Sequence, residues 1–122
     1  MSHLIPADLK YTKDHEWARI EGKTVTFGIT DFAQSNLGDI VFIELPEVGN
    51  TIAQGSACGV IESIKSVSDL CAPASGKVLA VNQEVEGNPA ACNSDAFGSW
   101  LVKIEATAPG ELTKLMNADQ YK

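Results

Sequence analysis

The sequence predicts a mainly β fold, a small flattened β-barrel or sandwich with quasi-twofold symmetry and a few short helices. Short apolar runs, rich in β-branched residues, are separated by Gly, Pro and Asn, which is typical of strands joined by turns. One pattern occurs twice: the run Gly38-Asp39-Ile40-Val41 returns as Gly76-Lys77-Val78-Leu79, and Gly49-Asn50 returns as Gly87-Asn88. Neither repeat has enough apolar surface to fold alone, so we expect the two to pack face to face. The 122 residues suit a single domain, residues 1–122.

The first third of the chain predicts a hairpin, a helix and a strand in that order. Residues 17–20 and 24–29 flank a turn at Gly22, with β-branched and aromatic residues on both sides. Thr30 or Asp31 can cap a helix of about two turns, Gln34 completes the capping pattern, and Gly38 can end the helix. A strand over residues 40–45 stops at Pro46.

The remaining elements are four short strands and a C-terminal helix. Residues 60–64 and 67–70 form two strands on either side of Lys65 and Ser66, and residues 78–81 and 100–104 form two more. A helix is expected to begin at Pro109, with one apolar stripe facing the core. This stripe comprises Leu112, Leu115 and Met116.

Composition excludes several classes of protein. The chain has 16 acidic and 9 basic residues, a net charge of −7, which argues against a nucleic-acid-binding surface. No apolar run approaches the roughly 20 residues of a membrane-spanning helix. The three cysteines include no Cys-x-x-Cys pair, so we expect reduced, buried thiols rather than a zinc site. Residues 1–6 show no signal-peptide pattern, so a bacterial cytoplasm is expected, with a processed mitochondrial form left open.

The residues predict no active site, and one lysine stands out instead. The sequence has no Gly-x-Ser-x-Gly elbow, no phosphate-binding glycine loop and no His-Glu-x-x-His helix, so we expect a chain that is not an enzyme. Lys65 lies between two short strands, with Glu62 three residues before it and Asp69 four after. A lysine in a turn is ordinarily a solvated cation. On a rigid hairpin, however, it also suits an enzyme that attaches a long cofactor through an amide bond.

Four motifs resemble the H-protein family of the glycine cleavage system. The resemblance runs from about residue 9 to about residue 121 and includes the segment around Lys65. The motifs are residues 11–17 (YTKDHEW), 28–34 (GITDFAQ), 37–46 (LGDIVFIELP) and 59–69 (GVIESIKSVSD).

The resemblance implies a fold, a cofactor and partners. The family fold is lipoyl/biotinyl-domain-like, a flattened hybrid barrel of two sheets with short helices. In the motif Glu62-Ser63-x-Lys65, the lysine would carry lipoic acid, attached by a lipoate-attaching enzyme. A pyridoxal-phosphate glycine decarboxylase would then load an aminomethyl group, a tetrahydrofolate-dependent aminomethyltransferase would remove it, and dihydrolipoyl dehydrogenase would reoxidise the dithiol. The chain itself would be a carrier.

The resemblance also implies a resting site for the loaded arm. The sequence departs from the family pattern at two places. Glu16 would attract the ammonium of the adduct, Trp17 would supply an apolar wall, and Asp69 is the other candidate anion. Cys58 and Cys71 replace residues that are commonly larger, and the segment 95–100 is about one residue shorter than usual.

Three alternatives stay open. Another lipoyl or biotinyl domain is one, although Ile64 and Ser66 replace the methionines of biotin carriers and the Asp and Ala of 2-oxo-acid dehydrogenase domains. A lipoyl donor that serves other lipoate-dependent complexes is the second. The third is an interaction domain without a prosthetic group, in which Lys65 would be dispensable.

Overall fold

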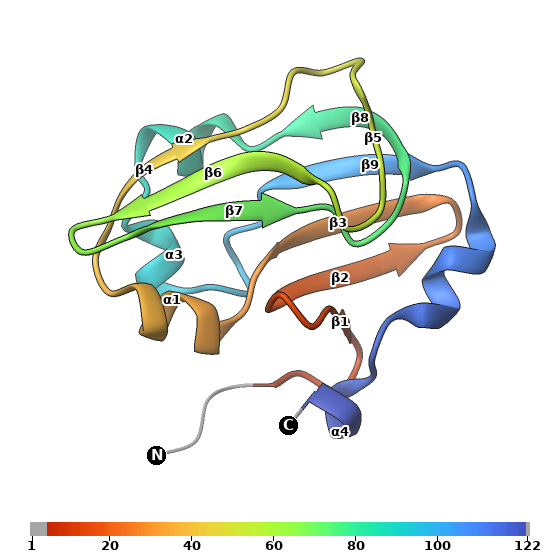
Figure 1. Cartoon of the computed structure of the whole chain (residues 1–122), viewed down its shortest axis with the longest axis horizontal. Helices are drawn as coiled ribbons and strands as arrows, with labels where there is room; N and C mark the ends of the chain where they lie inside the picture. Colours follow the sequence, from red (N-terminus) through yellow and green to blue (C-terminus); the bar gives the residue numbers. More distant parts are fainter. Residues whose placement is uncertain (1–4, 122) are drawn as a thin grey trace.

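The computed structural model describes residues 5–121, which form two antiparallel sheets joined by short helices (Figure 1). The larger sheet has the strand order β1-β2-β3-β9-β8-β5, and the smaller one has the order β4-β6-β7. The strands of the larger sheet are β1 (Lys10–Tyr11), β2 (Glu16–Glu21), β3 (Thr24–Ile29), β5 (Thr51–Ile52), β8 (Gly76–Val81) and β9 (Val102–Ala106). Those of the smaller sheet are β4 (Ile40–Glu44), β6 (Ala57–Ser63) and β7 (Val67–Cys71).

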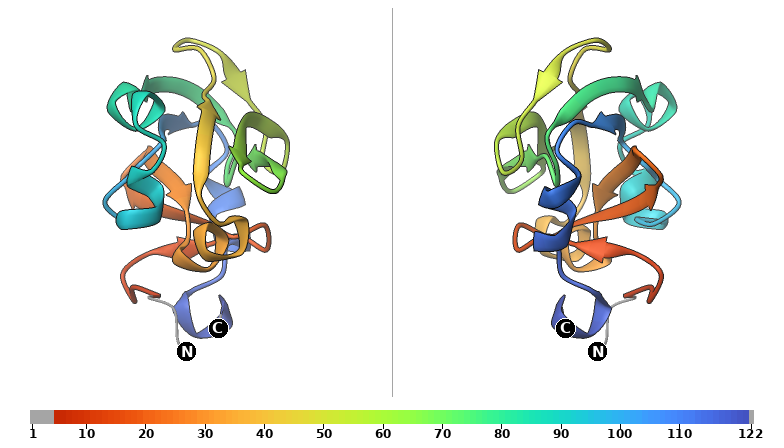
Figure 2. Two further views of the ribbon diagram at one scale, coloured as in Figure 1. Left: turned by 90° about the vertical axis from the view of Figure 1, so that its left-hand side faces the viewer. Right: turned by 90° about the vertical axis from the view of Figure 1, so that its right-hand side faces the viewer.

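The helices gather at the two ends of the sheets. Figures 1 and 2 show α1 (Asp31–Leu37), α2 (Gln83–Gly87) and α3 (Ala91–Ser94) at the end where the β6–β7 hairpin turns. The 3₁₀ helix η1 (Pro109–Lys114) lies at the opposite end, and α4 (Ala118–Tyr121) packs beside β1.

The core lies between the two sheets. Buried side chains from the smaller sheet, such as Ile43, Ile61 and Leu70, belong to one cluster with Phe27 and Ile104 of the larger sheet. Each sheet therefore buries one apolar face against the other, as expected for strands with alternating patterns. This confirms the predicted mainly β fold with short helices, although the sheets stay separate and do not close into a barrel.

The first predicted elements are confirmed. Strands β2 and β3 pair antiparallel across the Gly22 turn, where Gly22 has a φ of 64°. Thr30 caps α1, because its side chain accepts a hydrogen bond from the Ala33 N–H, and Gly38 follows the last helical residue with a φ of 79°. A positive φ favours glycine, so the end of this helix is fixed by the sequence itself.

The two repeats form similar strand pairs with different connections. Strand β4 pairs with β6, and β8 pairs with β9, both antiparallel. In the second repeat, however, Gly87 ends helix α2, which the Asn82 side chain caps, instead of forming a turn between strands. Helix α3 follows it, and β9 begins at Val102, two residues later than predicted.

The predicted C-terminal helix is divided into two short ones. Helix η1 ends at Lys114, and Met116 instead forms a bridge with Tyr11, in which each residue donates its N–H to the other's carbonyl at 2.8 Å. These two hydrogen bonds hold residue 116 in extended backbone, which ends the expected helix, although Leu112 and Leu115 do pack against the core. A second helix, α4, then begins after Asn117, whose side chain and that of Gln120 exchange hydrogen bonds with each other's N–H at 2.9 Å. This reciprocal pattern is a capping box.

The shortened segment 95–100 is held by local contacts. Asp95 Oδ1 accepts a hydrogen bond from the Gly98 N–H, Ser99 Oγ donates to the Ala91 carbonyl, and the Ala96 carbonyl accepts from Trp17 Nε1.

The expected localisation is based on residues 1–6, and residues 1–4 lie outside the described part of the chain. Residue 122 lies outside it as well. None of the described helices has the length and hydropathy of a membrane-spanning segment.

Candidate functional site

The turn between β6 and β7 is closed by the side chain and backbone of Ser63. The Ser63 N–H donates to the Ser66 carbonyl at 2.8 Å, while Ser63 Oγ accepts from the N–H groups of Lys65 and Ser66 at 3.3 and 3.1 Å. A serine hydroxyl that binds backbone groups two and three residues later stabilises a tight turn without glycine. Ser63 therefore fixes the backbone on which Lys65 stands.

Lys65 lies exposed at the tip of this hairpin, as the sequence predicts. The tip is tied to the start of β4, because the Ile64 N–H donates to the Asp39 carbonyl at 3.1 Å. The aliphatic part of the lysine passes Gly38, where an added Cβ would lie 3.5 Å from Lys65 Cε. Among residues 5–121, no group forms a hydrogen bond or ion pair with Lys65 Nζ. The amine is therefore free to react, on backbone that is held in place.

The two acids that flank Lys65 in sequence belong to the hairpin arms. Glu62 is half-buried on β6, opposite Val67, and Asp69 is exposed on β7, opposite Val60. Because side chains alternate along a strand, Glu62 and Asp69 lie on the same face of the smaller sheet in successive rows. Both acids thus lie on the hairpin itself, and Asp69 is farther from its tip than Glu62.

Glu16 lies elsewhere, at the first residue of β2, and it is buried with 2% of its surface exposed. Its carboxylate accepts hydrogen bonds from Thr12 Oγ1 and, at 3.3 Å, from the Cys71 N–H at the end of β7. A residue of the larger sheet therefore binds the backbone of the smaller one. Burial raises the pKa of Glu16 to about 7, and the nearby Asp14 adds to this, against the two hydrogen bonds, which lower it.

Three carboxylates influence the thiol of Cys71. Burial raises the pKa of this thiol, and the charges of Glu16, Asp14 and Asp69 raise it further. Both predicted anions, Glu16 and Asp69, therefore act on the same thiol, and so does Asp14, which sequence reasoning missed. Asp14 lies within the motif of residues 11–17, but nothing in the sequence shows that this loop faces β7.

Two expectations from the sequence need correction. Trp17 is fully buried, in a cluster with Leu9 and Tyr11, so it offers no exposed wall for a resting arm. Because consecutive residues of a strand point to opposite faces, Trp17 lies on the other side of β2 from Glu16. Of the three free cysteines, only Cys92 is buried, whereas Cys58 and Cys71 are half-buried.

His15, just before Glu16, is held by the C-terminal helix. It has a φ of 68°, a left-handed conformation that is uncommon for a residue other than glycine. Its Nδ1 lies 2.8 Å from the hydroxyl of Tyr121, which also lies 2.8 Å from Thr30 Oγ1. The Tyr121 ring stacks on Tyr11, with centroids 4.7 Å apart. Tyr121 thus connects the loop before Glu16 with the start of α1.

Replacing Tyr121 with phenylalanine is expected to lower the free energy of unfolding by about 1–2 kcal/mol, because two hydrogen bonds are lost while the stacking is kept. Urea unfolding followed by circular dichroism measures this. Tyr121→Leu, which also removes the stacking on Tyr11, should cost more. Equal stability of the wild type and Tyr121→Phe would show that the hydroxyl does not hold the loop.

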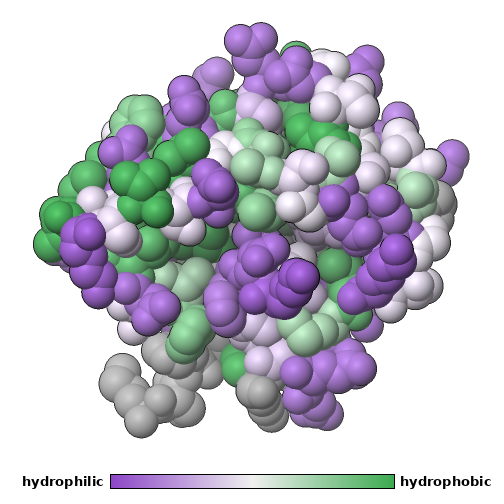
Figure 3. Space-filling view, in the orientation of Figure 1, coloured by the Kyte–Doolittle hydropathy of each residue, from purple (hydrophilic) through white to green (hydrophobic). Residues whose placement is uncertain are grey.

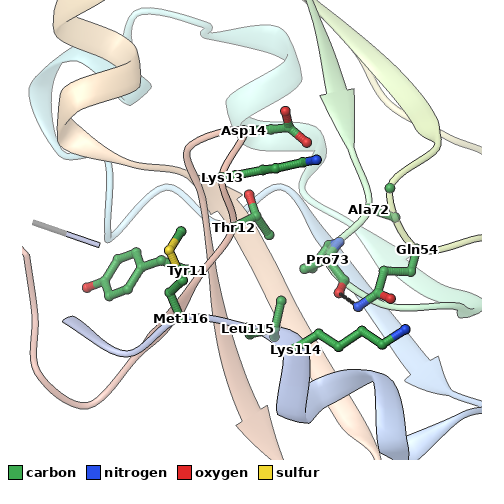
Figure 4. Close-up of a pocket in the computed structure, with 11 residues that line it drawn as sticks. Tyr11, Thr12, Lys13, Asp14, Gln54, Ala72, Pro73, Lys114, Leu115 and Met116 are labelled. Carbon is green, nitrogen blue, oxygen red and sulfur yellow. Dashed lines mark hydrogen bonds between the residues drawn. The ribbon is translucent and has the colours of Figure 1, made fainter. Parts of the chain in front are cut away.

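A pocket of about 480 Å³ opens beside this region (Figure 4). Lys13 and Asp14 of the loop between β1 and β2 lie at one side, and Lys114 of η1 lies at the other. Gln54 lines the pocket, and its side-chain amide donates a hydrogen bond to the Pro73 carbonyl at 3.0 Å. The pocket shares Asp14 with the acidic group around Cys71, but Lys65, Glu62 and Asp69 do not line it.

Known proteins resemble this chain over nearly its whole length. The family model described as Glycine cleavage H-protein matches residues 9–122. A glycine cleavage system H protein of Koribacter versatilis is 56% identical over 117 residues, which is 96% of this chain and 90% of that protein. One of Alkaliphilus oremlandii is 54% identical over 94% of this chain and 91% of that protein.

A solved structure is also similar. The crystal structure of a glycine cleavage system H protein from Mycobacterium marinum has a TM-score of 0.89 and 44% identity, and the match covers 96% of this chain and 95% of that one. The sequence and the fold thus agree over nearly the whole length. The chain belongs to the glycine cleavage H-protein family.

Proposed function

We propose that this chain is a non-catalytic carrier whose Lys65 bears lipoic acid through an amide bond. The observation that carries the proposal is the exposed Lys65 Nζ at the tip of a hairpin, without a partner among the described residues. No group of three or more His, Cys, Asp or Glu within residues 5–121 could hold a metal ion, so the lysine is the feature left to explain.

The residues around Lys65 fit an attached group. Ser63 and the Asp39 carbonyl hold the turn, so motion begins in the lysine side chain rather than in the backbone. The methylene groups of the lysine lie beside Gly38. When bound, lipoic acid supplies a disulfide that can be opened to take up a one-carbon group and later restored.

Asp14 and Asp69 are exposed and would meet the cargo, whereas Glu16, which is buried, would attract it through its charge. The negative charges of Glu16, Asp14 and Asp69 all act on the Cys71 thiol at the end of β7, and together they would attract an aminomethyl ammonium. Contact with an ammonium would favour the ionised form of Glu16, whose burial otherwise raises its pKa to about 7. Folding a loaded group against the domain would exclude water, and partner binding would release it.

The proposed partners are those that the family resemblance implies. They are the pyridoxal-phosphate glycine decarboxylase, the aminomethyltransferase, dihydrolipoyl dehydrogenase and the lipoate-attaching enzyme. The relatives described above are bacterial, and we propose the cytoplasm as the compartment.

Mass spectrometry of the chain purified from cells that make lipoate tests the proposal. We expect the intact mass to include one lipoyl group, and peptide fragmentation to place it on Lys65. A biotinyl mass at this position would contradict the proposal. So would a bare lysine in a strain that lipoylates its other carrier proteins.

A further inference from the structure

The surface around Lys65 is unusually apolar. Four large side chains are exposed there: Val41 (55%), Phe42 (48%), Ile64 (71%) and Val67 (65%). Phe42 and Val67 lie on either side of Glu62 in one row of the smaller sheet, and Ile64 adjoins Lys65. Figure 3 shows hydrophobic surface gathered at the left of the view, over β4 and the β6–β7 tip. We call these four residues the apolar collar.

Acidic residues outnumber basic ones in the segment that carries the collar. Between residues 39 and 71 the chain has a single basic residue, Lys65, and five acidic ones. Of these, Asp39 binds the tip through its carbonyl, and Glu44 and Asp69 are exposed on either side of Val60, in the row next to Phe42. A partner that covers the collar would therefore need an apolar recess bordered by Lys and Arg. The five are Asp39, Glu44, Glu47, Glu62 and Asp69.

The length of the Lys65 side chain indicates which partner would cover the collar. An extended lysine places its Nζ about 6 Å from its own Cα, by the lengths of the bonds between them. An enzyme that acts on this amine therefore comes close to the tip, where the exposed Ile64 and Val67 border Lys65 and Ser66. Enzymes that act on a bound dithiolane meet it at the end of an arm roughly twice as long, and they can work without covering the collar.

We propose that the apolar collar is the docking surface of the lipoate-attaching enzyme, through an apolar recess with a basic rim. This inference rests on the proposed lipoylation of Lys65. In the reaction, ATP first activates lipoate as an adenylate and pyrophosphate leaves. The neutral Nζ then attacks the carboxyl carbon of this adenylate. An amide bond forms, AMP leaves and one proton is released. The collar takes no part in this chemistry and acts on the affinity of the two proteins.

The test is the rate at which a purified lipoate–protein ligase modifies the unmodified chain with lipoate and ATP. Ile64→Ser and Phe42→Ser are each expected to lower kcat/KM about tenfold or more through a higher KM, because each removes a large apolar contact. Val48→Ser is the matched control. Val48 is equally exposed, at 60%, but it adjoins Gly49, whose N–H binds the Val78 carbonyl of β8. This variant should stay within about twofold of the wild type.

The same experiment separates the two proposals. If Ile64→Ser and Phe42→Ser are modified as fast as the wild type, or if Val48→Ser is slowed equally, the collar is not the docking surface. A wild-type chain that is not modified at all would contradict the proposed lipoylation itself. Thermal unfolding shows whether Phe42→Ser keeps its fold, and Ile64→Ser, at a more exposed site, carries the test if it does not.

A second measurement checks the choice of partner. The variants are lipoylated to completion with excess ligase and then loaded with glycine by glycine decarboxylase. Loading rates close to the wild type are expected for both. If the variants are lipoylated normally and lose only the loading step, the collar binds the decarboxylase and the inference is wrong.

Discussion

Replacing Lys65 with arginine is expected to abolish lipoyl attachment and all glycine-dependent activity of the reconstituted system. Arginine keeps a positive charge at the tip, but its guanidinium stays protonated and does not form the amide. Intact-mass spectrometry measures attachment, and release of CO₂ from glycine, with the three partner enzymes added, measures activity. Because Lys65 is exposed and its amine has no partner among residues 5–121, the free energy of unfolding should change by less than about 0.5 kcal/mol.

Lys77→Arg is the matched control for this variant. Lys77 is also an exposed lysine, but it lies on strand β8, away from the β6–β7 tip. It should keep both attachment and activity. Full activity of Lys65→Arg would favour the interaction-domain alternative, in which the chain needs no prosthetic group.

Replacing Glu16 with glutamine is expected to stabilise the protein at pH 8 and to have little effect near pH 4. The pKa of Glu16 is about 7 in the folded chain, against 4.5 as its ordinary value. Between these values the unfolded chain has lost the proton that the folded chain keeps, so the free energy of unfolding falls as the pH rises from about 4.5 to about 7. Above pH 7 this costs about 3 kcal/mol. Glutamine removes the charge and weakens one hydrogen bond, so a net gain of about 2 kcal/mol remains at pH 8.

Urea unfolding of the wild type and of Glu16→Gln at the two pH values measures the difference. Glu105→Gln, which changes an exposed acid on β9, should show no such dependence on pH. An equal effect of Glu16→Gln at pH 4 and pH 8 would mean that burial does not hold the proton on this carboxyl. The gain in stability should also be accompanied by a loss of carrier activity, if Glu16 receives the ammonium of the cargo.

The parts of the site that sequence could predict are those built from neighbouring residues. The hairpin, its exposed Lys65 and the cap at Thr30 each depend on residues within a few positions, so the sequence pattern specifies them. The pairing of Glu16 with the N–H of Cys71 joins residues 55 positions apart, and that of Tyr121 with His15 joins residues 106 apart. Such contacts depend on how the two sheets pack, which the local pattern does not contain.

The same limit explains two of the structural errors. The sequence predicts that Trp17, next to Glu16, is an exposed aromatic residue that could contact the arm. In the structure, Leu9 and Tyr11 pack with it over β2 and bury it. The stripe of Leu112, Leu115 and Met116 has helical spacing. The backbone of Met116, however, forms its hydrogen bonds with Tyr11 instead of with a preceding helical turn. In both cases a contact from a distant segment outweighs a local preference.

The contact between Glu16 and Cys71 has a consequence for how copies of this chain behave together. Within residues 5–121, β7 has a paired neighbour on one side only, and its other side could template a strand from another molecule. A carboxylate bound to the N–H at the end of β7 occupies one of the groups that such a strand would need, and Asp69 adds a second negative charge nearby. Natural β proteins use inward-pointing charges in this way to oppose aggregation. The Glu16 carboxylate therefore blocks part of the open edge of β7 against pairing with a strand of another molecule.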